Sequence, residues 1–276
     1  MNEINKAKPI SLFQMNWQQA LTATFVVIFC WQFWGMLLVY PAQYIPGSYN
    51  FLLPVSFLLG GVSAIFILMK TMKLLWKDLR NHLENPTSFA LLFLSILLYL
   101  FLLPFAEYLT EIVPTQGIPW LENWYQIMSE TFQKVFDYPI ASFLTICILA
   151  PILEEILFRG IILRGMLQKG LSPIFAIFFS SILFGLAHLN PWQFLGAGFL
   201  GGIIGFVYYR TKSLWLAIFL HALNNMISFY YMMKYESLEK NVSNLDHTTS
   251  IILLFMAGLI CGWTMYKLTQ NKQQWN

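Results

Sequence analysis

The chain has 276 residues, of which 58% are hydrophobic and 11% charged, and its formal net charge is +3. Soluble domains carry about 25% charged residues, so this composition excludes an ordinary soluble domain. The small net charge points to no particular partner, and we expect no nucleic acid among the partners. The three cysteines stand alone inside apolar stretches, which excludes a disulfide framework or a thiolate zinc site.

Eight apolar stretches follow one another along the chain, each near the roughly 20 residues that a membrane-spanning helix needs. A spanning segment must satisfy its own backbone hydrogen bonds, so all eight are predicted to be helices. The sequence therefore predicts an all-α integral membrane protein embedded in a lipid bilayer, with residues 1–276 forming one membrane domain. The first stretch is too long for a signal peptide and is expected to remain as an anchor. The predicted spans are 20–40, 51–69, 88–107, 139–160, 173–190, 193–209, 213–233 and 250–267.

The basic residues predict the orientation of these spans. With both termini in the cytoplasm, only Lys134, Lys234 and Lys240 fall on the outer side, and the other 13 of the 16 lysines and arginines fall inside. Positive residues concentrate on the cytoplasmic side of membrane proteins. This asymmetry favours cytoplasmic termini and an even number of spans.

Two connecting stretches are predicted to be amphipathic helices at the membrane surface. In 70–84, leucines recur every four residues beside a basic face, which is typical of a helix on an anionic leaflet. In 119–136, tryptophans and other apolar residues recur at near-helical spacing. We interpret the second helix as an aromatic belt, with a lid over a substrate as the alternative.

The sixth predicted span contains two overlapping GxxxG patterns, Gly198/Gly202 and Gly201/Gly205. Small residues at this spacing let helix backbones approach closely. Packing inside the bundle is the simpler interpretation, and a homodimer through this glycine-rich helix is the alternative.

Ionisable residues inside the predicted spans are the strongest functional signal, because a charge in the bilayer costs several kcal/mol. The fourth span contains Glu154, Glu155 and Arg159. The fifth ends at His188, and the seventh contains His221 and, four residues later on the same helix face, Asn225. A purely structural polar network is the alternative, and it fits the Glu155–Arg159 pair best.

A hairpin predicts that these groups lie at one depth. Gly170 and Pro173 mark the turn between the fourth and fifth spans. Glu155 lies 15 residues before Gly170, and His188 lies 15 residues after Pro173. At 1.5 Å per residue both are roughly 22 Å from the turn, provided that the fourth span stays helical to about Lys169.

The motifs EExxxR, FxxxH and HxxxN, in this order on separate membrane helices, resemble the CPBP family. This family comprises type II CAAX prenyl endopeptidases and bacterial bacteriocin-processing or self-immunity proteins, also called Abi. The resemblance covers a motif core of about 139–228. The matching positions are Glu154, Glu155, Arg159, Phe184, His188, His221 and Asn225.

The resemblance implies an intramembrane endopeptidase with a membrane-associated protein or peptide substrate and a site open toward the cytoplasm. It implies that Glu154 and His188 activate water, while His221 and Asn225 stabilise the oxyanion and Glu155, with Arg159, supports or tunes the site. Phe184 belongs to the same structural support. The bacterial cytoplasmic membrane is the expected location.

Two questions of chemistry stay open at this point. The family has been described as metalloproteases, and Glu154, His188 and His221 with a water would make an acceptable zinc shell. No HExxH motif is present, and a glutamate and a histidine can activate water without a metal. The alternatives to catalysis are an immunity protein against a peptide toxin and a transporter with a proton relay.

Overall fold

The computed structural model describes residues 13–42, 44–76, 80, 83, 87–235 and 248–270, and all regular structure within them is helical. The basic helix predicted at 70–84 is not continuous: α3 ends at Thr71, and residues 72–75 form a non-helical turn in which Lys73 has a φ of 54°. Residues 77–79, 81–82 and 84 lie outside the described residues. The elements are α1 (Trp17–Trp34), η1 (Gly35–Val39), α2 (Tyr40–Ala42), α3 (Tyr49–Thr71), α5 (Phe89–Glu111), α6 (Pro119–Asp137), α7 (Pro139–Phe143), η2 (Leu144–Leu149), α8 (Ala150–Glu155), η3 (Ile156–Leu163), α9 (Arg164–Gln168), α10 (Pro173–Ala187), α11 (Pro191–Thr211), α12 (Leu214–Tyr235) and α13 (Thr248–Leu268).

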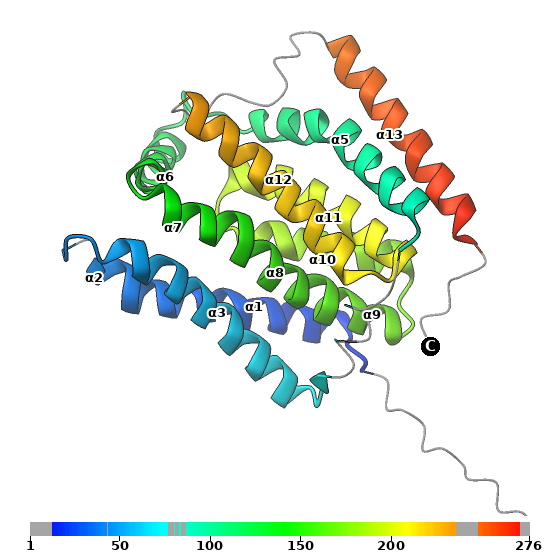
Figure 1. Cartoon of the computed structure of the whole chain (residues 1–276), viewed down its shortest axis with the longest axis horizontal. Helices are drawn as coiled ribbons and strands as arrows, with labels where there is room; N and C mark the ends of the chain where they lie inside the picture. The colour runs from blue at the N-terminus through cyan, green and yellow to red at the C-terminus, as the bar shows by residue number, and fades with distance from the viewer. Residues whose placement is uncertain are drawn as a thin grey trace, which may run out of the picture.

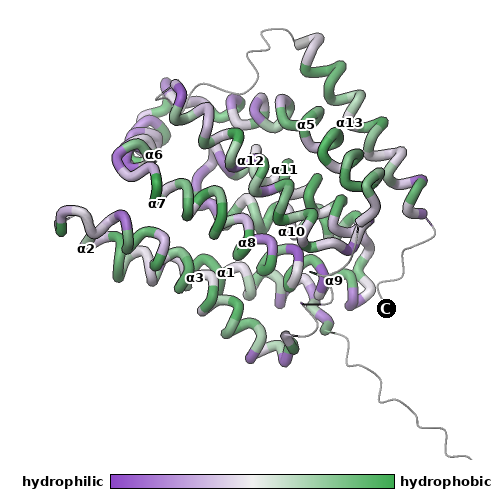
Figure 2. The backbone as a smooth tube through the Cα atoms, in the orientation of Figure 1, coloured by the Kyte–Doolittle hydropathy of each residue, from purple (hydrophilic) through white to green (hydrophobic). Residues whose placement is uncertain are grey.

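Seven helices in the described part of the chain are long and apolar enough to cross a membrane. Their positions agree with seven of the predicted spans, and Figure 2 shows apolar residues along most of their length. The chain is therefore an all-α integral membrane protein. The fourth span runs without a break over Pro139–Gln168, which confirms that it continues past Arg159.

The predicted fifth span, 173–190, is shorter than expected. Helix α10 has 15 residues and is about 22 Å long, below the roughly 30 Å of the hydrocarbon core. It ends because Leu189 adopts a left-handed conformation with φ of 54° and because Pro191 starts α11. The turn between α10 and α11 consequently lies within the depth of the bundle.

The fourth span forms the centre of the bundle. All eight residues of η3 are buried, and η3 contacts α1, α3, α10, α11 and α12 (Figure 1). An apolar helix in a membrane protein could face lipid, but η3 is enclosed by other helices of the chain. Any polar group on this segment must therefore find its partners inside the protein.

The glycine-rich helix α11 packs against α10. A Cβ added at Gly198 or Gly202 would meet only Ser181, and one added at Gly205 would meet Ile177 and Leu163. These glycines face neighbouring helices of the same chain, which supports internal packing. Homodimerisation stays a prediction.

Helix α6 runs across one end of the bundle. Figure 1 shows it end-on, with its axis across those of α7 and α8. It contacts the start of α11, where the Tyr125 and Trp192 rings meet edge to face at 5.1 Å. The amphipathic helix predicted at 119–136 is present, and we call this end of the bundle the α6 side.

Candidate active site

Glu155 and Arg159 form a buried ion pair on the central span. Nη1 of Arg159 donates to Oε1 of Glu155 at 2.8 Å, and the two residues are 1% and 0% exposed. Nη2 of Arg159 donates to the carbonyl of Gly201 at 2.8 Å, and the guanidinium lies over the Phe184 ring. The predicted pair exists and connects the fourth span to α10 and α11.

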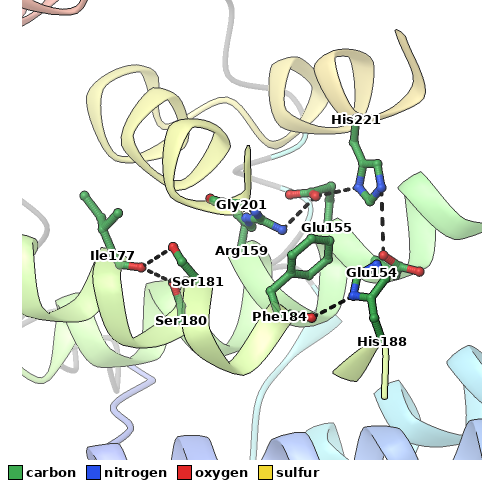
Figure 3. A network of polar contacts seen from close by, with 10 residues as sticks. All are labelled: Glu154, Glu155, Arg159, Ile177, Ser180, Ser181, Phe184, His188, Gly201 and His221. Atoms are coloured by element: carbon green, nitrogen blue, oxygen red, sulfur yellow. Dashed lines mark hydrogen bonds and ion pairs between the residues drawn. The ribbon is translucent and has the colours of Figure 1, made fainter. Parts of the chain in front are cut away.

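His221 completes a row of three side chains with the two glutamates. Its Nδ1 lies 2.8 Å from Oε1 of Glu155, and its Nε2 lies 3.8 Å from Oε2 of Glu154 (Figure 3). Because Oε1 of Glu155 also receives the Arg159 hydrogen bond, that carboxylate is the acceptor and Nδ1 of His221 the donor. The other ring nitrogen, Nε2, faces Glu154.

His188 is held in a similar way at the end of α10. Its Nδ1 lies 2.9 Å from the carbonyl of Phe184, in the last turn of the helix. A carbonyl only accepts, so Nδ1 is the donor and Nε2 takes no part in this bond. The side chain thereby satisfies one of the carbonyls that a helix end leaves unpaired.

The Phe184 ring lies between the two histidines. It meets His188 edge to face at 5.0 Å and His221 at 5.7 Å. Glu154 and His188 line the same cavity and lie next to each other in Figure 3. The fourth and fifth spans therefore bring their functional residues to one level, as the hairpin predicted, around a turn at Gly170 with φ of 86°.

Asn225 is fixed by a local feature of the fourth span. In the π-helical stretch η2 the N–H of Ala150 bonds to Thr145, which leaves the carbonyl of Ile146 for the next residue. That residue is Pro151, which has no N–H, and the Nδ2 of Asn225 donates to this carbonyl instead, at 2.8 Å. One N–H of Asn225 remains for another acceptor.

Two cavities reach this cluster from the α6 side. The larger, about 820 Å³, is lined by Glu154, His188 and mostly apolar residues of α1, η1 and α3. The smaller, about 230 Å³, is lined by His188, His221 and Asn225. Phe184 and His188 border both cavities.

The position of these cavities conflicts with a site open toward the cytoplasm. The larger includes Lys134 of α6, a residue that the charge asymmetry places outside. The Gly170 turn, with the predicted cytoplasmic ends, lies at the opposite end of the central span. Cytoplasmic termini and a cytoplasmic opening of these cavities therefore exclude each other, and both stay predictions until the orientation of the chain in the membrane is measured.

Three polar residues at the site were not singled out from the sequence. Glu107 lines the smaller cavity, and it was missed because it coincides with the end of the predicted span 88–107. Asn224 donates to Oδ1 of Asn225 at 3.1 Å. Two adjacent asparagines in an apolar helix are the sequence feature that could have identified it. Tyr99 is buried and borders the smaller cavity, which no spacing rule indicates.

The described residues do not bring a metal cluster together. No three His, Cys, Asp or Glu side chains among them are grouped so that they could hold a metal ion. In both histidines Nδ1 is the nitrogen engaged in a hydrogen bond, so that Nε2 is the ring atom that could bind a metal. Metal dependence therefore stays a question for experiment.

Comparison with known proteins supports the family predicted from the motifs. Residues 136–227 match the sequence model of the type II CAAX prenyl endopeptidase Rce1-like family. This segment contains every residue of the candidate site named from the sequence.

A curated relative agrees with that match. The "Putative membrane peptidase YdiL" of Bacillus subtilis (strain 168) is 34% identical over 134 residues, which are 48% of this chain and 52% of that protein. The chain thus spans about half the length of the curated relative that it matches. No solved structure matches the chain.

Proposed function

We propose that this chain, which carries the Rce1-like region of the CPBP family, is an intramembrane endopeptidase that hydrolyses a peptide bond of a membrane-associated protein or peptide. The observation that carries the proposal is the row of Glu155, His221 and Glu154 at the inner ends of the two cavities. A purely structural network would not need a carboxylate facing an 820 Å³ cavity.

In the proposed reaction, Glu154 and His188 activate a water molecule. Glu154 takes the proton as the water oxygen attacks the carbonyl carbon of the peptide. The Nε2 of His188 accepts a hydrogen bond from the other O–H of that water, which keeps its hydrogen. This bond directs a lone pair of the water oxygen toward the substrate carbonyl. Both groups line the larger cavity, where the substrate would bind.

The attack places negative charge on the carbonyl oxygen, and His221 and Asn225 stabilise it. The free N–H of Asn225 is a neutral donor to this oxygen. His221 acts in its protonated form, which it keeps throughout the reaction: Nε2 donates to this oxygen, and the neighbouring Glu155 carboxylate balances the positive ring. Glu155 is thus a positioning residue, and the leaving amine takes up the proton held by Glu154.

A zinc ion is the alternative source of activated water. Glu154, His188 and His221 are the residues that would hold it, and it would lower the pKa of its bound water. In the described structure these three side chains are not grouped as a metal cluster.

The experiment is cleavage of a fluorescent membrane peptide library by the purified protein in detergent or liposomes. We expect Glu154→Gln and His188→Asn each to lower the rate by about 10²–10⁴-fold, the usual contribution of a general acid or base. Glu130→Gln on α6 is the matched control, because this exposed carboxylate lines neither cavity. Full cleavage by the two site variants would exclude the proposed mechanism.

A further inference from the structure

The smaller cavity differs from the larger in the chemistry of its walls. Away from the candidate catalytic residues it is lined by the side chains of Glu107, Thr110, Gln193, Asn224 and Ser228. These come from α5, α11 and α12, and they alternate with alanine, glycine and leucine. A polar cavity of about 230 Å³ has room for several water molecules at roughly 30 Å³ each, with two or more polar partners for each.

The two cavities divide the candidate catalytic residues between them. Glu154 lines the larger cavity, while His221 and Asn225 line the smaller. His188 borders both, and the Phe184 ring stands between them. A water molecule that moves inward from Glu107 would arrive beside His188 and His221, next to Glu154.

Hydrolysis inside a membrane needs a supply of water that the substrate does not block. The larger cavity is mainly apolar, and a substrate segment that fills it would displace the water within it. The smaller cavity meets the same catalytic groups from another direction. Its lining includes Ser228, which is exposed.

We propose that the smaller cavity is a water chamber that supplies the hydrolytic site, and that Glu107 keeps it hydrated. This inference rests on the proposed function. Glu107 is the only carboxylate among the described residues that line the chamber. The polar end of this side chain can hydrogen-bond to water inside the chamber. Glu107 is a positioning residue here, since it acts through water.

Thiol labelling tests the hydration of the chamber without any substrate. We replace Cys30, Cys147 and Cys261 by alanine and introduce Leu103→Cys or Leu100→Cys in α5, three residues apart at nearly the same depth. Leu103 is 5% exposed and lines the chamber, whereas Leu100 is 38% exposed and lines neither cavity, so that it faces lipid in the membrane. A charged methanethiosulfonate reagent reacts only where water reaches the thiol.

We expect Leu103→Cys in liposomes to react about tenfold or more faster than Leu100→Cys, because the reactive thiolate needs water. Equal rates would overturn the water chamber, while peptide cleavage by the parent protein would still support the proposed function. Absence of cleavage together with fast labelling would overturn the assignment of the chamber to hydrolysis.

Variants of Glu107 separate hydration from structure. Glu107→Gln keeps the size and polarity of the side chain, and we expect cleavage to stay within about twofold and labelling of Leu103→Cys to stay fast. Glu107→Leu removes the polar group, and we expect kcat to fall about tenfold with KM unchanged, while labelling slows. An equal loss in both variants, or a change in KM alone, would overturn the role of Glu107.

Discussion

The Nδ1 of His221 donates to the same oxygen of Glu155 that receives the Arg159 guanidinium, and both hydrogen bonds are 2.8 Å long. One carboxylate oxygen thus fixes the ring of His221 and compensates the charge of Arg159. The other oxygen, Oε2, is buried without a hydrogen-bond partner among the described residues. The stability of the central span and the orientation of His221 therefore depend on one side chain, and mutations can separate them.

Breaking this pair should destabilise the protein more than removing it. Arg159→Leu leaves the Glu155 carboxylate buried without its cation, which costs about 3–5 kcal/mol. The double variant Glu155→Leu, Arg159→Leu removes both charges, so we expect it to regain most of the thermal stability in detergent. It should still lack cleavage activity, because His221 has lost the acceptor for its Nδ1.

The comparison of the two variants is informative in either direction. Equal melting temperatures for the single and double variants would show that the ion pair does not determine stability. Cleavage by the double variant would show that His221 needs no orienting carboxylate.

Gly201 is predicted to tolerate no side chain. An added Cβ would lie 2.9 Å from the Phe184 ring and 3.2 Å from Nη2 of Arg159. Since both neighbours are buried and held by further contacts, we expect Gly201→Ala to cost about 1–3 kcal/mol and to reduce cleavage. Gly202→Ala is the matched control on the same helix, because its Cβ would meet only Ser181 at 3.4 Å or more. Equal melting temperatures for the two variants would contradict the prediction.

The spans and the residues of the cluster could be predicted because both depend on position along the chain. Apolar length marks a membrane helix, and a charge inside such a helix is conspicuous. Counting from the Gly170 turn placed Glu155 and His188 at one depth, since the rise per residue is nearly constant. The pairing of Glu155 with Arg159 followed from their spacing of four residues.

The rest of the site depends on contacts between helices, which the spacing of residues does not encode. The hydrogen bond from Asn225 to Ile146 crosses from α12 to the fourth span. It exists because a π-helical turn of that span is followed by Pro151, which cannot donate to the Ile146 carbonyl. Glu107 is the last residue of the predicted span 88–107, and only its neighbours in the structure show that it lines a cavity. Helix α10 is short because Leu189 adopts a left-handed backbone conformation, and a leucine in the sequence does not predict that conformation.

Chelation tests which source of activated water the site uses. In the proposed mechanism Glu154 and His188 activate water without a metal, so we expect cleavage by the purified protein to be unchanged after dialysis against a strong chelator. The measurement is the initial rate before dialysis, after dialysis and after addition of zinc. Loss of activity that zinc restores would assign a metal to Glu154, His188 and His221.

The side of the membrane from which substrate approaches follows from the orientation of α6. Both cavities extend toward the α6 side, and the basic residues place that side outside the cytoplasm. In a background without native cysteines, we expect Glu130→Cys, exposed on α6, to react with an impermeant thiol reagent added to intact cells. Lys169→Cys, exposed after α9 at the opposite end of the central span, should react only after permeabilisation. The reverse pattern would place both cavity mouths in the cytoplasm, and substrates would then be sought among cytoplasmic peptides.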